Sequence, residues 1–276
     1  MTQPSTVQPS TTPGTLSVQL YTFRDAYAAD PAGTIARIAE LGFRYIEPFG
    51  IGNHGLRNAD KVSRAQELRA LLDAHGLKAP TAHTAAPMGE NAEAVLDAIG
   101  ALGATLPVIS WPGEVPGFER DVMDTKDGTE RFADALSEAS RHAQSRGLSL
   151  GYHNHWWEWS WFGDQSAYDL LLSRLDPAVF LEIDTYWAHT AGQDMPALIR
   201  RLGERVRALH LKDGPATPDA DQTPLGTGTV DYAAAIAAAP QARWHILEMD
   251  RTAGDVFAEV GQSAQKLIQE GRSTWE

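Results

Sequence analysis

The sequence predicts an α/β fold, a single-domain (β/α)₈ barrel of the TIM type, and three observations support this prediction. Eight short apolar runs alternate with helical stretches along the whole chain. The runs start about 26 to 42 residues apart, which matches the length of one strand–helix–strand unit. Several helical stretches end in glycine just before the next strand, as in Leu41-Gly42-Phe43 and Arg146-Gly147-Leu148.

The predicted strands are short and rich in Val, Ile, Leu and aromatic residues, which is typical of buried parallel strands. In chain order they are Leu16–Thr22, Tyr45–Phe49, Lys78–His83, Leu106–Ser110, Leu148–Asn154, Phe180–Asp184, Val206–Leu211 and Trp244–Met249. The helices expected between and after them are Asp30–Leu41, Ala59–His75, Asn91–Leu102, Thr129–Arg146, Ser166–Leu175, Met195–Leu202, Tyr232–Ala238 and Asp255–Gln269. Eight such units favour a closed barrel. A doubly wound open sheet is the second interpretation, although no G-x-G-x-x-G motif follows the first strand.

Length and composition indicate one folded domain. The chain has 276 residues, of which 43% are hydrophobic, as in ordinary globular proteins. Residues 1–15 are rich in Ser, Thr, Pro and Gln, which predicts a disordered N-terminal tail before a barrel over residues 16–276. These first residues lack the basic and apolar segments of a signal peptide, and no apolar run approaches the ~20 residues of a membrane helix. We therefore expect a cytoplasmic protein without a membrane partner.

Charge and cysteine content narrow the function further. The net charge is -13, and such a surface repels phosphate backbones, so we expect no nucleic-acid partner. The chain has no cysteine, so any metal ion must be held by histidines and carboxylates. The sequence leaves open whether the protein forms a homo-oligomer.

Acidic and basic residues gather at the predicted carboxyl ends of the strands, where barrel enzymes carry their active sites. Glu47 and His83 end the second and third strands, and residues 152–158 (Tyr-His-Asn-His-Trp-Trp-Glu) follow the fifth. Because side chains alternate along a strand, three pairs should point into the barrel while leucine, isoleucine and methionine point outward. These pairs are Glu182 with Asp184, His210 with Lys212, and Glu248 with Asp250.

Several carboxylates and a histidine meeting in one buried space would repel each other or lose their charge. A divalent cation resolves this conflict by joining them in one coordination shell. A ligand set of oxygens with one imidazole favours Mn²⁺, with Mg²⁺ and Co²⁺ as alternatives and Zn²⁺ not excluded. We therefore predict one divalent metal ion as the cofactor.

At these strand ends the chain resembles the xylose isomerase-like TIM-barrel superfamily, in particular the sugar phosphate isomerase/epimerase family, over about residues 16–270. Five motifs in order carry the resemblance: Tyr-His-Asn-His-x-x-Glu (152–158), Leu-Glu-Ile-Asp-Thr-x-Trp (181–187), Leu-His-Leu-Lys-Asp (209–213), Leu-Gly-x-Gly-x-Val-Asp (225–231) and a glutamate at 248.

The resemblance implies a metal site made of Glu158, Asp184, His210 and Glu248, in which the two glutamates also act as acid and base. Ketose 3-epimerases of this family have a glutamate within strand five, where this chain has Tyr152. His153 or His155 is therefore the alternative for the first ligand or the base.

The remaining site predictions assign roles around this metal. The predicted catalytic residues are Glu158, Glu248 and His155, and the predicted substrate-binding residues are His83, His153, Lys212, Glu47 and Trp187. Trp187 stands where epimerases have a substrate-binding histidine. Lys212 either stabilises an oxyanion or forms a salt bridge with Asp213. The alternative for the predicted acidic ligands is a purely structural role, as partners in ion pairs inside the barrel. Five further histidines are expected to be surface or framework residues: His54, His75, His142, His189 and His245.

The predicted function is proton transfer next to the carbonyl of a sugar or a polyol-derived ketone, assisted by the metal ion. An isomerase or epimerase is the first interpretation, and a dehydratase or lyase acting on a keto sugar, 3-keto-glycoside or keto-inositol is the second. Two other classes are phosphodiester cleavage, as in the endonuclease branch of the superfamily, and non-catalytic sugar binding. The negative charge of the chain disfavours the former.

Overall fold

The structure is a computed structural model that describes residues 13–276. The predicted tail lies largely outside the described residues, but its boundary differs, since the first strand already begins at Gly14. In residues 13–276, none of the helices combines the length and the apolar character that crossing a bilayer demands.

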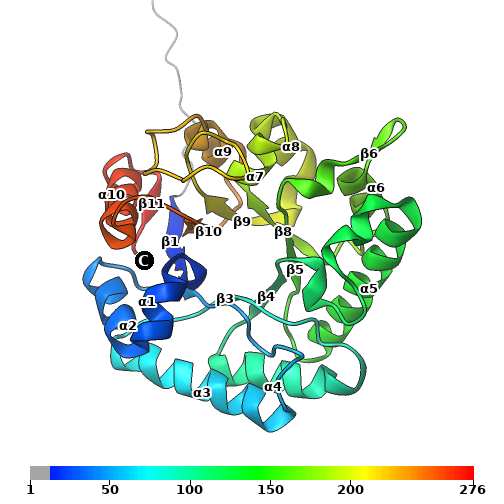
Figure 1. Ribbon diagram of the computed structural model, residues 1–276, viewed down its shortest axis with the longest axis horizontal. Coiled ribbons are helices and arrows are strands. Elements are labelled where there is room, and N and C mark those ends of the chain that lie inside the picture. Colours follow the sequence, from blue (N-terminus) through cyan, green and yellow to red (C-terminus); the bar gives the residue numbers. More distant parts are fainter. Residues whose placement is uncertain (1–12) are drawn as a thin grey trace, which may run out of the picture.

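Eight parallel strands form the nearly closed barrel that the sequence predicts (Figure 1). They are β1 (Gly14–Gln19), β2 (Ile46–Glu47), β3 (Thr81–His83), β4 (Leu106–Ile109), β5 (Gly151–His153), β8 (Phe180–Asp184), β9 (Val206–Leu211) and β10 (Trp244–Leu247). The pairing runs from β2 through β1, β10, β9, β8, β5 and β4 to β3. The last side, between the segments of β2 and β3, is closed by two isolated parallel bridges, Tyr45 to Lys78 and Ile51 to Thr84.

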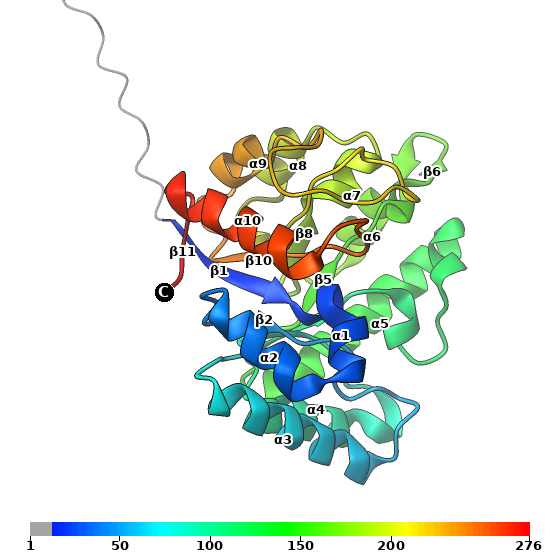
Figure 2. The ribbon, with the colours of Figure 1, turned by 60° about the vertical axis from the view of Figure 1, so that its left-hand side comes forward.

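Helices surround the barrel in the predicted order. They are α2 (Pro31–Glu40), α3 (Asn58–Ala74), α4 (Ala92–Leu102), α5 (Lys126–Ser145), α6 (Ala167–Arg174), α8 (Met195–Leu202), α9 (Tyr232–Ala238) and α10 (Val256–Gln269). Many begin at a side chain that accepts a backbone N–H bond, such as Asp30, Thr125 and Ser166. The first and last of these helices, α2 and α10, lie on either side of β1 in Figure 2. They meet where the Arg37 guanidinium of α2 stacks on the Phe257 ring of α10, 3.6 Å from its centroid.

Short elements that the sequence analysis did not predict complete the fold, and one of them, η1 (Leu20–Phe23), replaces the end of the first predicted strand, Leu16–Thr22. They are α1 (Arg24–Ala29), α7 (Thr185–Thr190), the hairpin of β6 (Trp161–Phe162) and β7 (Gln165–Ser166), and β11 (Ser273–Thr274). The 3₁₀ segments are η1 (Leu20–Phe23), η2 (Gly89–Asn91), η3 (Pro112–Glu114), η4 (Arg120–Asp124), η5 (Trp157–Trp159) and η6 (Gly203–Arg205). Each has seven residues or fewer, too short for a periodic apolar pattern to reveal it.

The barrel interior is divided into an apolar layer and a charged layer. The apolar layer is a buried cluster near the amino ends of the strands: Leu106, Val108, Phe180, Ala208, Trp244 and Ile246. Along β8, Phe180 belongs to this layer, and the next two residues on the same face are Glu182 and Asp184. The alternating residues Leu181 and Ile183 pack into the main core under the helices. The predicted inward and outward faces are therefore correct.

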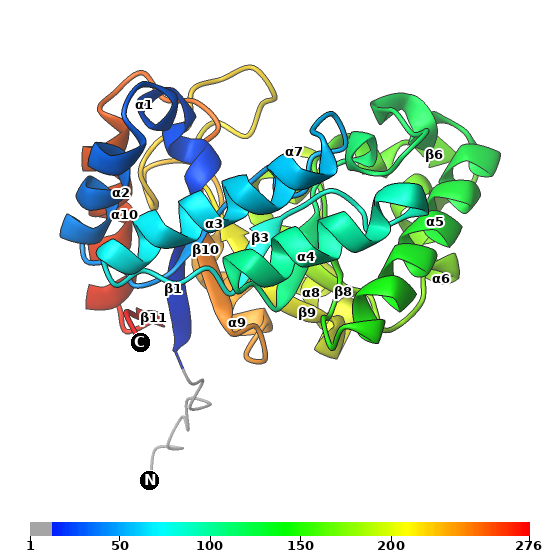
Figure 3. The same ribbon diagram turned by 90° about the horizontal axis from the view of Figure 1, so that it is seen from below.

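One carboxylate organises the long loop of residues 212–231 between β9 and α9. The oxygens of Asp213 accept four backbone N–H bonds, from Gly214, Gly226, Gly228 and Val230, at 2.7–3.0 Å. A Cβ at Gly228 would lie 2.2 Å from Asp213 Oδ1, which accounts for the second glycine of the Leu-Gly-x-Gly motif. In Figure 3 this loop and α1 lie at the same end of the barrel.

Candidate active site

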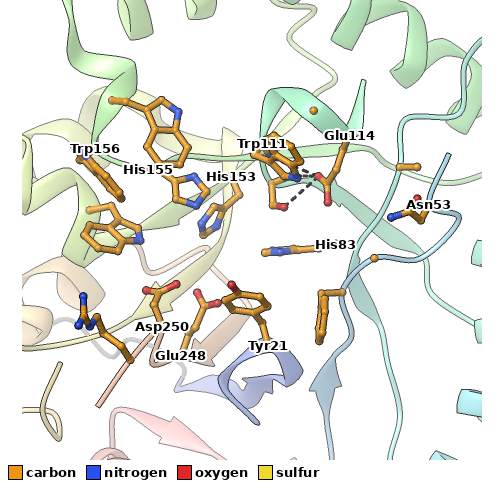
Figure 4. A pocket seen from close by; sticks show the side chains of 18 of the residues that line it. Tyr21, Asn53, His83, Trp111, Glu114, His153, His155, Trp156, Glu248 and Asp250 are labelled. Atoms are coloured by element: carbon orange, nitrogen blue, oxygen red, sulfur yellow. Dashed lines mark hydrogen bonds between the residues drawn. The ribbon is translucent and has the colours of Figure 1, made fainter. Parts of the chain in front are cut away.

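A cavity of about 670 Å³ opens at the carboxyl ends of the strands, where the sequence predicts the site (Figure 4). Five predicted site residues line it: His83, His153, His155, Trp187 and Glu248. The wall also contains residues that carried no predicted site role, among them Tyr21, Phe49, Asn53, His54, Trp111, Glu114, Trp156, Trp157, Asp250 and Arg251. His54, expected to be a framework or surface residue, is therefore a cavity residue.

The other predicted residues lie deeper or to one side. Glu47, Asp184, His210 and Lys212 are at most 2% exposed and lie around the cavity floor. They come from β2, β8, β9 and the residue after β9, so the barrel brings together groups that are far apart in sequence. The remaining predicted site residue, Glu158, is fully buried in η5.

Ligand atoms of His153, Asp184, His210 and Glu248 all lie within 4.8 Å of one another. A second, overlapping group joins His153 and His210 to His83 and Glu182. Glu158 is in neither group. The geometry thus unites three of the four predicted ligands and adds a histidine from β5, the alternative that the sequence left open.

Unpaired oxygens within this cluster fit a cation. Glu47 Oε2 and Glu182 Oε2 are buried without a hydrogen bond among the described residues. One oxygen of Asp184 accepts the Trp187 N–H at 2.8 Å and so caps α7. This bond orients the Asp184 carboxylate, whose Oδ2 lies 2.9 Å from the Lys212 ammonium. The buried group could therefore hold a metal ion.

Hydrogen bonds fix the histidines around the floor. His210 Nδ1 lies 2.7 Å from Glu248 Oε2, and its Nε2 lies 2.8 Å from Glu47 Oε1. His83 Nε2 lies 2.9 Å from Glu182 Oε1. Gln19, a residue that the sequence analysis missed, donates to Glu47 Oε1 at 2.9 Å. Each of these two rings is thus held between two carboxylates, and some of these carboxylates come from strands across the barrel.

The pKa values report strong coupling between the buried carboxylates and histidines. Burial disfavours a charged His83, but Glu47 and Glu182 outweigh it and raise its pKa to about 10. Burial raises the pKa of Asp184 to about 6, although Lys212 and His210 act in the opposite direction. Burial also pushes up the pKa of Glu182, but its charged neighbours, chiefly His210 and His153, hold it at about 2. A divalent cation would stabilise the ionised form of these buried carboxylates.

Lys212 supplies a fixed positive charge at the floor. Its ammonium lies 2.6 Å from Glu248 Oε2, 2.7 Å from Asp250 Oδ2 and 2.9 Å from Asp184 Oδ2. The alternative salt bridge to Asp213 is wrong, because both Asp213 oxygens are occupied by the backbone of the loop described above.

Glu158 is bonded within its own segment. Its Oε1 accepts the Tyr152 hydroxyl at 3.0 Å, and its Oε2 accepts the His155 N–H at 3.0 Å. Burial raises the pKa of Glu158 to about 7. These bonds fix the turn that carries His155 into the cavity, and the ligand and catalytic roles of Glu158 stay predictions.

A comparison with known families matches residues 35–272 to the family described as xylose isomerase-like TIM barrel. Among curated proteins, inosose dehydratase from Bacillus anthracis (strain CDC 684 / NRRL 3495) is 29% identical over 192 residues, which is 65% of this chain. The match spans 62% of that relative's length.

Solved structures of sugar-converting enzymes share the fold. A sugar phosphate isomerase/epimerase from Parabacteroides distasonis ATCC 8503 superposes with a TM-score of 0.71 and 20% identity, over 99% of both chains. D-psicose 3-epimerase from Clostridium cellulolyticum H10 gives a TM-score of 0.66 and 15% identity, over 94% of this chain and 100% of its own. With its barrel, its mouth cavity and the match over residues 35–272, this chain belongs to the xylose isomerase-like TIM barrel family.

Proposed function

We propose that this protein is a divalent-metal-dependent enzyme that removes a proton from the carbon next to the carbonyl of a polyol-derived ketone. The observation that carries the proposal is the buried set of His153, Asp184, His210 and Glu248 at the floor of the cavity. Two imidazoles and two carboxylates favour Mn²⁺ first, then Co²⁺ or Zn²⁺, and Mg²⁺ less. When bound, such an ion supplies Lewis-acid polarisation of the substrate carbonyl.

Unpaired polar atoms in the cavity wall support a polyol substrate. His155 Nδ1, Trp157 Nε1 and Trp187 Nε1 are buried nitrogen atoms without a hydrogen bond among the described residues. All three residues line the cavity. A buried unpaired polar group costs about 1–3 kcal/mol, so a ligand rich in hydroxyl oxygens would gain by occupying this wall. The aromatic faces beside these atoms suit the flat C–H faces of a six-membered ring.

The chain offers distinct groups for proton transfer. We assign the base to His155, since its ring lines the cavity and its Nδ1 is unpaired. Glu248, the other cavity-lining candidate, is already bonded to His210 and Lys212. Lys212 supplies positive charge to an oxyanion that develops beside Glu248. Glu47 holds His210 in place, and His83 and Trp187 contact the substrate from the wall.

Two outcomes can follow the same first step. Loss of a β-hydroxyl gives dehydration, and the curated relatives at 28–29% identity, all described as inosose dehydratases, favour this outcome. Proton return to the opposite face or to the neighbouring carbon gives epimerisation or isomerisation, the reactions for which the structural neighbours are named. We propose dehydration of a cyclic keto-polyol first and epimerisation or isomerisation second.

Incubation with Mn²⁺ in D₂O tests the proposal, with an inosose (a ketone of inositol), D-psicose and D-tagatose as probes. We expect solvent deuterium beside the carbonyl of at least one probe, and mass spectrometry separates water loss from epimerisation. Asp184→Asn and Glu248→Gln should lose metal and activity while circular dichroism shows an intact fold. The proposal fails if no probe exchanges or if both variants keep full metal content.

A matched pair of variants identifies the fourth ligand. His153→Gln should lose bound Mn²⁺, whereas Glu158→Gln should retain it, because Glu158 lies outside both candidate ligand groups. Inductively coupled plasma mass spectrometry on the dialysed proteins measures the difference. The reverse result would restore Glu158 as the ligand.

A further inference from the structure

A carboxyl group outside the predicted set stands in the cavity wall. Glu114 is the last residue of η3, which follows β4, and it lines the cavity together with Ser110 and Trp111. Figure 4 shows Glu114 on the side of His83, apart from His155 and Trp156. Neither candidate metal group contains Glu114, so its carboxyl is free of the cluster at the floor.

Only one oxygen of Glu114 is used by the protein. Its Oε2 accepts the backbone N–H groups of Ser110 and Trp111 and, at 3.1 Å, the Ser110 hydroxyl. The Glu114 carboxylate thus caps the start of its own helical turn, because it accepts the N–H of Trp111, the residue before η3, which is a structural role. Among the described residues Oε1 has no hydrogen-bond partner, so the cap leaves half of the carboxyl available to a ligand.

The surroundings of Glu114 fix its position and raise the pKa of its carboxyl group. His54 Nε2 lies 3.1 Å from the Glu114 carbonyl oxygen and links η3 to the loop after β2. Burial raises the pKa of the carboxyl to about 7, opposed by the charge of His83 and by the bonds from Ser110 and Trp111. Tyr152, from β5, is a further titratable neighbour.

We propose that Glu114 is a second catalytic residue, the acid that delivers a proton to the substrate through Oε1. This inference rests on the proposed function. In dehydration, the base takes the proton from the carbon beside the carbonyl, and that C–H pair becomes the new C=C bond. The β C–O bond breaks with its electron pair on oxygen, and Glu114 protonates this oxygen. The substrate loses one water, and solvent returns the base's proton to the Glu114 carboxylate. In epimerisation, Glu114 protonates the carbon instead.

The variant Glu114→Gln separates the structural role of Glu114, which is to cap the helical turn, from its proposed role as a proton donor. Its amide oxygen still accepts from Ser110 and Trp111, but the side chain cannot deliver a proton. With the probe that the wild type converts, we expect kcat to fall about 10²–10⁴-fold, with KM, bound Mn²⁺ and Tm little changed. For a dehydrating probe, deuterium exchange beside the carbonyl should persist while water loss slows. Glu119→Gln, exposed on the same loop, should behave like the wild type.

Ser110→Ala gives an independent test if Glu114→Gln is poorly folded. Loss of the hydroxyl removes a bond that lowers the Glu114 pKa, so the limb of the kcat/KM profile near pH 7 should move to higher pH. An unmoved limb, or unchanged kcat in Glu114→Gln, would overturn the role of Glu114 and leave the proposed function standing. Absence of wild-type exchange with every probe would instead count against the proposed function.

Discussion

The Lys212 ammonium lies 2.6 Å from Oε2 of Glu248, a carboxylate that also belongs to the candidate ligand group. It would therefore compete with the proposed metal ion for the same negative charge. Lys212→Met should destabilise the metal-free protein by about 3–5 kcal/mol, because buried carboxylates lose their fixed partner. Mn²⁺ should then raise the Tm of the variant by more than that of the wild type. Differential scanning fluorimetry measures both shifts, with exposed Lys126→Met as control. Equal shifts would contradict this competition.

Phe180 fills the space that a side chain at Gly151 would occupy. A Cβ there would lie 2.4 Å from Cζ of the Phe180 ring, in the apolar layer of the barrel. Gly151→Ala should lower the free energy of unfolding by about 1–3 kcal/mol through overpacking. Gly100→Ala, in the exposed face of α4 with open space around it, should instead raise it by up to about 1 kcal/mol. Urea unfolding compares the two, and equal effects would refute the packing argument.

His245 makes the fold sensitive to acid. Burial lowers its pKa to about 4, from about 6.5 in an unfolded chain. Between these values the unfolded chain binds a proton that the folded chain does not, so stability falls as pH drops from about 6.5 to 4. The loss approaches about 3 kcal/mol at pH 4. His245→Asn should flatten the dependence of unfolding free energy on pH in this window, whereas exposed His75→Asn should not. If the unfolding free energies of the wild type and of His245→Asn depend on pH in the same way, His245 is not the source of the acid sensitivity.

The Asp213 carboxylate should control the order of the loop over residues 212–231. An amide has one acceptor oxygen instead of two, so Asp213→Asn cannot satisfy all four N–H groups. We expect faster hydrogen exchange at Gly226, Gly228 and Val230, with unchanged exchange in the strands. Mass spectrometry of peptides from this loop measures the effect. Unaltered protection would show that other contacts hold the loop.

The barrel and the floor of the site follow from local patterns in the sequence. A period of two residues along a strand places Glu182 and Asp184 on one face, whatever the rest of the fold does. The same rule places His210 beside Lys212. Because all strands are parallel, their carboxyl ends meet, and the pattern alone predicts which groups gather.

The wall of the cavity could not be predicted in the same way. His54 lies in a loop and Glu114 in the three-residue segment η3, and in neither does a periodic pattern indicate where the side chain points. Glu158 was assigned to the metal by its place in a motif, but the turn after β5 directs its oxygens to Tyr152 and the His155 N–H. The signal available for Glu114 was its place four residues after the end of a predicted strand, next to Trp111 and Pro112.

The anchoring of one long loop by Asp213 divides that loop into a fixed part and a variable part. The N–H groups that Asp213 binds belong to Gly214 and to residues 226–230. The intervening stretch of residues 215–221 makes no bond to Asp213 and is tied instead by the Tyr186 hydroxyl, which donates to the Thr217 carbonyl, and by the Arg251–Asp221 ion pair. Insertions there would lengthen the rim beside Pro218 without moving the strand ends. Substrate range could thus be broadened by grafting at this point while the reaction centre stays as it is.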